Sequence, residues 1–172
     1  MAGEEYLKHN KSLREVIAWL KTEGDVLETD REVDPDLELV GLQKHMDGGP
    51  VLFFNNVKGM PHARAVTNLF SDINVVDKMF GFEDGRDRTR KLAHSLTHPL
   101  KPVEISHEEA PVQQHVLTEN LDVNQWITAI RHTKLESELT IGSGISCVIG
   151  DYFDGGSHIG YNRMNFRRGN VS

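Results

Sequence analysis

The sequence predicts an α+β protein whose character changes near residue 100. Up to about Leu100, apolar residues recur at helical spacing in some segments and form short strand-like runs in others. Beyond Pro99, Pro102 and Pro111, the most legible patterns are two long strands joined by a glycine-rich turn. The chain has 172 residues, which suits one domain or one domain with part of a second.

The first expected helix begins after Ser12. Ser12 and Glu15 have the spacing of a capping box, in which the serine caps the helix and the glutamate returns to the serine amide. Gly24 follows the last turn as a left-handed stop, and residues 26–29 predict a short strand. The helix carries one apolar stripe, made of Leu13, Val16, Ile17 and Leu20.

Asp34 and Pro35 predict the N-cap and first residue of a second helix, which would run to about His45. Residues 47–50 form a turn, and the apolar run 51–54 is typical of a strand buried on both faces. Residues 64–67 could be its neighbour. Helical patterns resume at about 72–80 and 86–95.

The second half predicts a hairpin of strands 141–149 and 158–166, with a turn at Asp154-Gly155-Gly156. Glu136 and Glu138 alternate before it, and we expect both to face solvent. Cys147 is the only cysteine, which excludes an intrachain disulfide and a cysteine-based zinc site. Its apolar neighbours predict a buried structural thiol.

A formal net charge of -7 argues against a nucleic-acid partner, because no extended positive field is available to meet phosphates. The one basic cluster, Arg163, Arg167 and Arg168, suits a single phosphorylated ligand. We expect a cytoplasmic protein, since the first ten residues lack the apolar core of a signal peptide and no window is apolar enough to cross a membrane.

Simpler interpretations exist for each polar motif. The arginine cluster could be a solvated face, and His158 could be an ordinary surface histidine beside a turn. His94 and His98 have the i, i+4 spacing of a zinc-chelating pair on a helix. Pro99 directly afterwards disfavours helix at this position, and this argues against the pair.

Five segments, in order along the chain, resemble one enzyme family, the UbiD-type decarboxylases. The first joins residues 12–17 to residues 33–38. Residues 49–59 (GPVLFFNNVKG) are similar to the family's "GPALLFENVKG", and residues 68–70 (NLF) match its "NLF". Residues 140–146 (TIGSGIS) resemble the strand before the family's cofactor loop, and residues 158–164 (HIGYNRM) resemble the loop itself, "NxGxYRM".

The resemblance implies an N-terminal α/β domain over residues 1–110 and the first strands of a split β-barrel flavin-binding domain over residues 111–172. It also implies prenylated FMN as cofactor, with a divalent metal (manganese or magnesium) and potassium. Family members decarboxylate aromatic or α,β-unsaturated carboxylic acids reversibly, and the cofactor carries out the carbon chemistry. A flavin prenyltransferase would supply that cofactor.

Carried over residue by residue, the resemblance places Arg163 beside the cofactor and the substrate carboxylate, as the catalytic residue expected here. The guanidinium fork fits a pair of oxygens. His158 stands where the family has a metal-binding asparagine, and imidazole is a softer ligand than an amide oxygen. The expected cofactor-binding residues are Ser146, Tyr161, Asn162 and Arg163.

The family's remaining metal ligands and its catalytic glutamates lie downstream of this loop, so we expect no decarboxylation by this chain alone. Three functions remain open. The chain could be the N-terminal part of a decarboxylase, a non-catalytic subunit that completes a split enzyme, or a flavin- or metal-binding module. A half-barrel leaves a strand edge unpaired, so we expect the isolated chain to be unstable or to self-associate, as a homo-oligomer or with a complementing chain.

Overall fold

The computed structural model describes residues 12–98, 103–119, 121–122, 126–148 and 158–166. The chain divides into two compact units, each made of two stretches of sequence. The first combines Met1–Val26 with Leu69–Leu121, and the second combines Leu27–Asn68 with Asp122–Ser172. These units cut across the expected domain boundary near residue 110, and that boundary stays a prediction.

The described residues of the first unit form the helices α1 (Leu13–Glu23), α3 (Ile73–Phe80) and α4 (Gly85–Thr97) and a short 3-10 turn, η2 (Pro111–Gln113). The expected start and stop of α1 are confirmed, because Ser12 Oγ accepts from the Glu15 amide at 3.2 Å and Gly24 has φ +80°. Lys78 on α3 binds Glu23, the last residue of α1, at 3.3 Å, and Asp25, two residues beyond it, at 2.6 Å. None of the described helices is long and apolar enough to span a bilayer.

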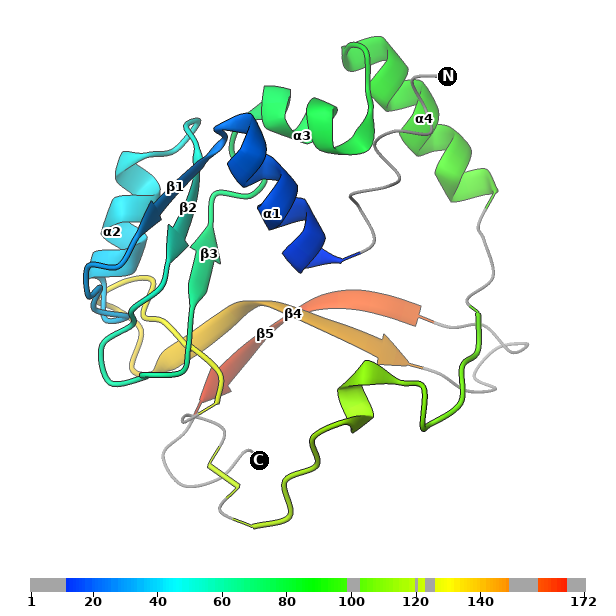
Figure 1. Cartoon of the computed structure of the whole chain (residues 1–172). Helices are drawn as coiled ribbons and strands as arrows, with labels where there is room; N and C mark the ends of the chain where they lie inside the picture. The colour runs from blue at the N-terminus through cyan, green and yellow to red at the C-terminus, as the bar shows by residue number, and fades with distance from the viewer. Residues whose placement is uncertain (1–11, 99–102, 120, 123–125, 149–157, 167–172) are drawn as a thin grey trace. The chain divides into compact units, whose positions relative to one another are not determined.

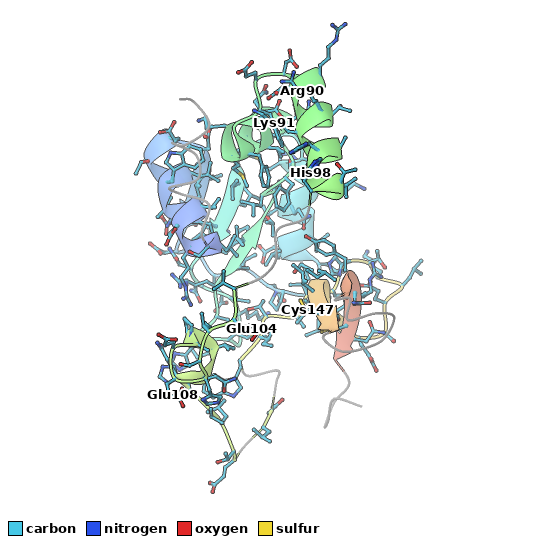
Figure 2. The ribbon with its side chains drawn as sticks, turned by 90° about the vertical axis from the view of Figure 1, so that its right-hand side faces the viewer. Arg90, Lys91, His98, Glu104, Glu108 and Cys147 are labelled. Carbon is cyan, nitrogen blue, oxygen red and sulfur yellow. The ribbon has the colours of Figure 1, made fainter. Side chains whose placement is uncertain are left out.

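A carboxylate near the start of α4 organises that helix. Asp87 is only 6% exposed and binds Lys91 and Arg90, each at 2.7 Å, and it accepts the Glu83 amide at 3.1 Å. Figure 2 labels both basic residues on α4. The hydrogen bond from Lys91, with help from the Glu83 amide and Arg90, lowers the pKa of Asp87 to about 2.

The second unit contains a three-stranded sheet in the order β1 (Val26–Thr29), β2 (Val51–Phe54), β3 (Ala65–Thr67), which Figure 1 shows beside α2 (Glu38–His45). All four residues of β2 are buried, which confirms the predicted central strand. Strands β2 and β3 are antiparallel. The core of this unit contains Val33, Leu39, Leu52, Phe54, Val57 and Met60.

The predicted start of the second helix is wrong by three residues, because α2 begins at Glu38. The Pro35 carbonyl accepts the Arg131 amide at 3.0 Å, and Asp36 forms a parallel bridge with Arg131. These two residues therefore pair with a distant segment instead of entering the helix. Leu37 lies between Asp36 and the first residue of α2 and has φ +73°, a conformation that costs energy for a branched residue.

Asn68 closes the other end of α2. It adopts φ +59°, and its side-chain amide donates to the carbonyls of Gln43 and Met46 at 3.0 and 3.1 Å. Carbonyls in the last turn of a helix have no partner within the helix, so Asn68 supplies one from the end of β3. Asparagine tolerates the left-handed region better than most residues.

The expected hairpin is confirmed in the described part of the chain. Strands β4 (Leu139–Val148) and β5 (His158–Phe166) pair antiparallel, from Leu139 opposite Phe166 to Val148 opposite His158. The start of β4 also pairs with the preceding segment, because Thr140 and Ile130 exchange amide–carbonyl hydrogen bonds of 2.8 and 3.0 Å. The predicted turn at residues 154–156 lies outside the described residues.

Candidate cofactor-loop site on the hairpin

The register of the hairpin distributes the expected cofactor residues over both faces. Ser146 pairs with Gly160 and Gly144 pairs with Asn162, while Ile145 pairs with Tyr161. Paired residues share a face and successive residues alternate. Ser146 and Asn162 therefore lie on one face, and Tyr161 lies on the opposite face.

Arg163 lies on the same face as Tyr161 and opposite a β-bulge. Ile141 pairs with Met164 and Gly144 pairs with Asn162, so two residues of β4, Gly142 and Ser143, stand against the single residue Arg163. A bulge of this kind bends the strand and redirects the neighbouring side chains. The described hairpin therefore does not bring all four expected cofactor residues onto one face.

Gly144 next to the bulge is needed for the close approach of the two strands. A methyl group on its α-carbon would lie 2.8 Å from the backbone oxygen of Asn162 and 2.6 Å from Met164 Cε. Real Cβ contacts are essentially never this short. Gly142, in the same strand, has no such restriction, because its nearest contact would be His132 Nε2 at 3.5 Å.

Arg163 forms an ion pair with Glu136, from Nη1 to Oε1 at 3.1 Å. The arginine side chain is 61% exposed, whereas the glutamate side chain is only 17% exposed. The expectation that Glu136 faces solvent is therefore wrong. The described segment before β4 folds back so that its carboxylate reaches the guanidinium on β5.

The other oxygen of Glu136 is fixed by the backbone. Its Oε2 accepts the amides of His132 at 2.7 Å and Thr133 at 3.4 Å. The His132 amide is the main cause that holds the pKa of Glu136 below its ordinary value, against the effect of burial. The sequence contained a signal for this, since Thr133 and Glu136 have the spacing of a capping box.

The metal expectation rests on His158, which is the first residue of β5 and pairs with Val148. The placement of its side chain lies outside the described part. Among the residues that are described, no group of three or more histidine, cysteine, aspartate or glutamate side chains could hold a metal ion. His94 and His98 stack on each other at 3.9 Å between ring centroids, at the end of α4.

Cys147 is exposed, so the prediction of a buried thiol is wrong. It lies near the end of β4 (Figure 2), on the same face as Ile145 and Ile159, which are also exposed. Ile145, one of the apolar neighbours that suggested burial, is therefore itself exposed.

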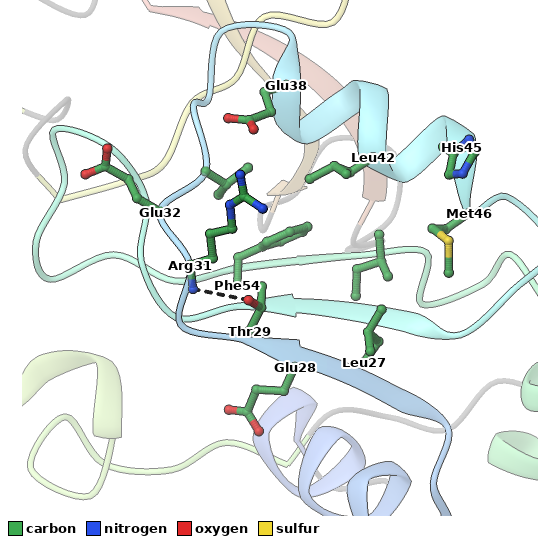
Figure 3. A pocket seen from close by; sticks show the side chains of 12 residues that line it. Leu27, Glu28, Thr29, Arg31, Glu32, Glu38, Leu42, His45, Met46 and Phe54 are labelled. Atoms are coloured by element: carbon green, nitrogen blue, oxygen red, sulfur yellow. Dashed lines mark hydrogen bonds between the residues drawn. The ribbon is translucent and has the colours of Figure 1, made fainter.

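Described residues of the second unit line cavities at two places. One of about 180 Å³ lies beside the bulge, where Arg64, Thr128, Gly142 and Ser143 are among its lining residues. The other, of about 450 Å³, lies between α2 and the strands β1 and β2. Figure 3 shows Leu42 and Phe54 facing the second cavity, beside the Arg31 amide that donates to Thr29 Oγ1 at 3.1 Å. None of the expected site residues is among the residues that line either cavity.

Comparison with known proteins identifies the chain's relatives. Residues 17–96 match the 3-octaprenyl-4-hydroxybenzoate carboxy-lyase N-terminal domain (UbiD_N). Gallate decarboxylase from Lactiplantibacillus plantarum is 30% identical over 131 residues, which cover 69% of this chain and 26% of that protein. The chain belongs to the UbiD family. The chain spans about a quarter of the length of this gallate decarboxylase.

Solved UbiD-class structures share the fold. An evolved dimeric form of HmfF from Pelotomaculum thermopropionicum, in complex with prFMN, is 27% identical with a TM-score of 0.81 and covers 90% of this chain and 35% of its own. Vanillic acid decarboxylase ShVdcCD from Sedimentibacter hydroxybenzoicus has the same TM-score, with 91% of this chain and 36% of its own covered. At 19% identity, the second likeness shows the fold alone.

The UbiD-like segments of the first seventy residues are mainly structural in this chain. Lys58, in the GPVLFFNNVKG segment, binds Asp34 at 2.6 Å. Asn55 of the same segment donates to Glu28 and Asp30 at 2.8 and 2.9 Å. Together with Asn68, these residues hold the sheet and α2 together. The candidate site residues of the UbiD chain all come from the hairpin.

Proposed function

We propose that this chain contributes the opening strands of a prenylated-FMN site in a UbiD-type reversible decarboxylase of aromatic or α,β-unsaturated carboxylic acids. The observation that carries the proposal is the likeness to the HmfF complex with prFMN, which extends over 90% of this chain at a TM-score of 0.81. The family resemblance of β5, from His158 to Met164, supports the same assignment. Gallate decarboxylase as a relative favours aromatic acids as substrates.

Three side chains of the hairpin are suited to this role. Arg163 presents an exposed guanidinium, whose planar fork matches a carboxylate or a phosphate. Ser146 and Asn162 offer polar groups on the face opposite Arg163. When bound, prenylated FMN supplies the electron sink for loss of carbon dioxide, while these residues orient it and the substrate.

A divalent metal and potassium are part of this proposal only through His158. The described residues supply no metal-ligand group of their own, so we assign no step to a metal. The chain covers 35% of the HmfF chain, so further ligands and the proton-transferring glutamates would come from a continuing or complementing polypeptide. A second copy of the chain or a complementing chain would be a partner in such an enzyme. A flavin prenyltransferase would supply the cofactor.

The test is a graft into the gallate decarboxylase relative. This chain would replace the matching N-terminal quarter of that enzyme in cells that also make a flavin prenyltransferase, and release of carbon dioxide from gallate would be measured. We expect activity in the graft and a loss of about 100-fold or more on Arg163→Met, a range typical for removal of one charge-stabilising donor. Equal activity in both grafts would refute the role of Arg163.

The unmodified chain provides a second measurement that does not depend on the graft. We expect it to change FMN absorbance and fluorescence on titration, and Arg163→Met to weaken this binding. No spectral change at high micromolar FMN, together with an inactive graft, would contradict the proposed cofactor site.

A further inference from the structure

We propose that Glu136 is a positioning residue that holds Arg163 through one guanidinium nitrogen, so that its remaining edge faces an anionic oxygen pair. The inference rests on the proposed role of Arg163 at the cofactor site. The group recognised is a carboxylate or a phosphate, which share this oxygen geometry.

The first argument is that the Glu136 carboxylate is fixed before Arg163 binds it. Its Oε2 accepts the amides of His132 and Thr133, and the Glu136 amide donates to the Thr133 carbonyl at 3.2 Å. The segment therefore closes on itself as a turn, and Oε1 is left to point at β5. With 17% of its side chain exposed, Glu136 has little freedom to swing into solvent.

The second argument is that only a carboxylate can make both sets of contacts. Both oxygens of Glu136 accept hydrogen bonds, one from backbone amides and one from Arg163 Nη1. A glutamine has one acceptor and one donor in the same positions. Whichever way its amide is turned, an N–H group would face either the His132 amide or the guanidinium.

The third argument concerns what the contact leaves open. Arg163 binds Glu136 through Nη1 alone, and its Nε and Nη2 bind no partner among the described residues. Those two nitrogens form one edge of the planar fork, the arrangement used for two-point binding of a carboxylate or phosphate. The bulge lies opposite Arg163 in the hairpin, and a bulge redirects the side chains next to it.

An ion pair whose arginine is largely exposed contributes little to stability, so we assign this contact a role in orienting Arg163. A free arginine side chain samples many rotamers and must be ordered when it binds a ligand. The ion pair with Glu136 would order the Arg163 side chain before the ligand binds, so that less conformational entropy is lost on binding. The competing possibility is a latch, in which Glu136 occupies Arg163 and must be displaced; it predicts the opposite sign in the experiment.

The experiment compares the full chain with Glu136→Gln, Arg163→Met and the double variant. Glu108→Gln is the matched control, because Glu108 is exposed and the substitution makes the same change of charge (Figure 2). The probes are FMN, riboflavin and benzoate. FMN against riboflavin isolates the phosphate, and benzoate tests the carboxylate. In parallel, the Nε–H signal of Arg163 is followed by NMR. The signal is assigned by its absence from the spectrum of Arg163→Met.

We expect Glu136→Gln to weaken binding of FMN or benzoate about tenfold, which corresponds to roughly 1.4 kcal/mol, and Glu108→Gln to leave it unchanged. The Arg163 Nε–H signal should shift and sharpen in Glu136→Gln only. In the Arg163→Met background, Glu136→Gln should have no further effect on binding.

Two other outcomes separate the inference from the proposed function. If Arg163→Met weakens binding but Glu136→Gln leaves it unchanged or strengthens it, the positioning role is overturned and the cofactor role of Arg163 stands. If Arg163→Met has no effect with any probe, the proposed role of Arg163 fails and the inference fails with it. Comparison of riboflavin with FMN then shows whether flavin binds without help from this arginine.

Discussion

Replacing Gly144 by alanine tests the close contact between β4 and β5 beside Arg163. The added methyl group would lie 2.8 Å from the Asn162 backbone oxygen, which cannot rotate away, and 2.6 Å from Met164 Cε, which can. The strands would have to separate by a few tenths of an ångström. Overpacking of this kind costs about 1–3 kcal/mol, and each kcal/mol lowers Tm by about 2–4 °C in a chain of this size.

Gly142→Ala is the matched control in the same strand. Its methyl group would make only an ordinary contact with His132, and a glycine-to-alanine change at an unstrained position gains about 0.4–1 kcal/mol by restricting the unfolded chain. Urea denaturation of the two variants would give opposite shifts of midpoint. If Gly144→Ala were as stable as Gly142→Ala, the argument from close strand approach would be refuted.

Three further outcomes follow from the described contacts. Leu39→Ala should lower the free energy of unfolding by about 2–5 kcal/mol in urea titrations, because Leu39 is fully buried in the core of the second unit; a loss below 1 kcal/mol would contradict that packing. Asp87→Asn should lower Tm at neutral pH. Since the folded pKa of Asp87 is lowered to about 2, wild type should keep its full advantage above about pH 4 and lose it as pH falls through about 2; an advantage that did not change with pH would exclude the charge as its source. Cys147 should react with one equivalent of a thiol reagent in the native state, and reaction only after denaturation would show that it is buried.

Most elements of the fold were predictable because their signals are local. Ser12, Gly24 and the apolar stripe between them define α1 without help from the rest of the chain. The run 51–54 is apolar at every position, as a strand buried on both faces must be. The start of α2 was not predictable in this way. Pro35 and Asp36 have the local chemistry of a helix start, but pairing with Arg131 outweighs it.

The candidate site was predictable as a segment and not as a geometry. The resemblance of residues 158–164 predicts a site on the segment that forms β5, and alternation in β5 fixes which of these residues share a face. The partner of Arg163 was missed because Glu136 was judged by alternation in a strand, whereas it lies in a turn before β4. Cys147 was misjudged because apolar neighbours predict burial only where something covers them.

The pairing of Asp36 with Arg131 has a consequence for synthesis on the ribosome. The sheet segment of the second unit is translated early, but Arg131 and the fully buried Ala129 belong to the same unit and emerge much later. At about 5–20 residues per second, the wait lasts several seconds. During that interval the nascent sheet and α2 lack the segment around Arg131, whose amide binds the Pro35 carbonyl. We expect this early segment to be the one that needs a chaperone.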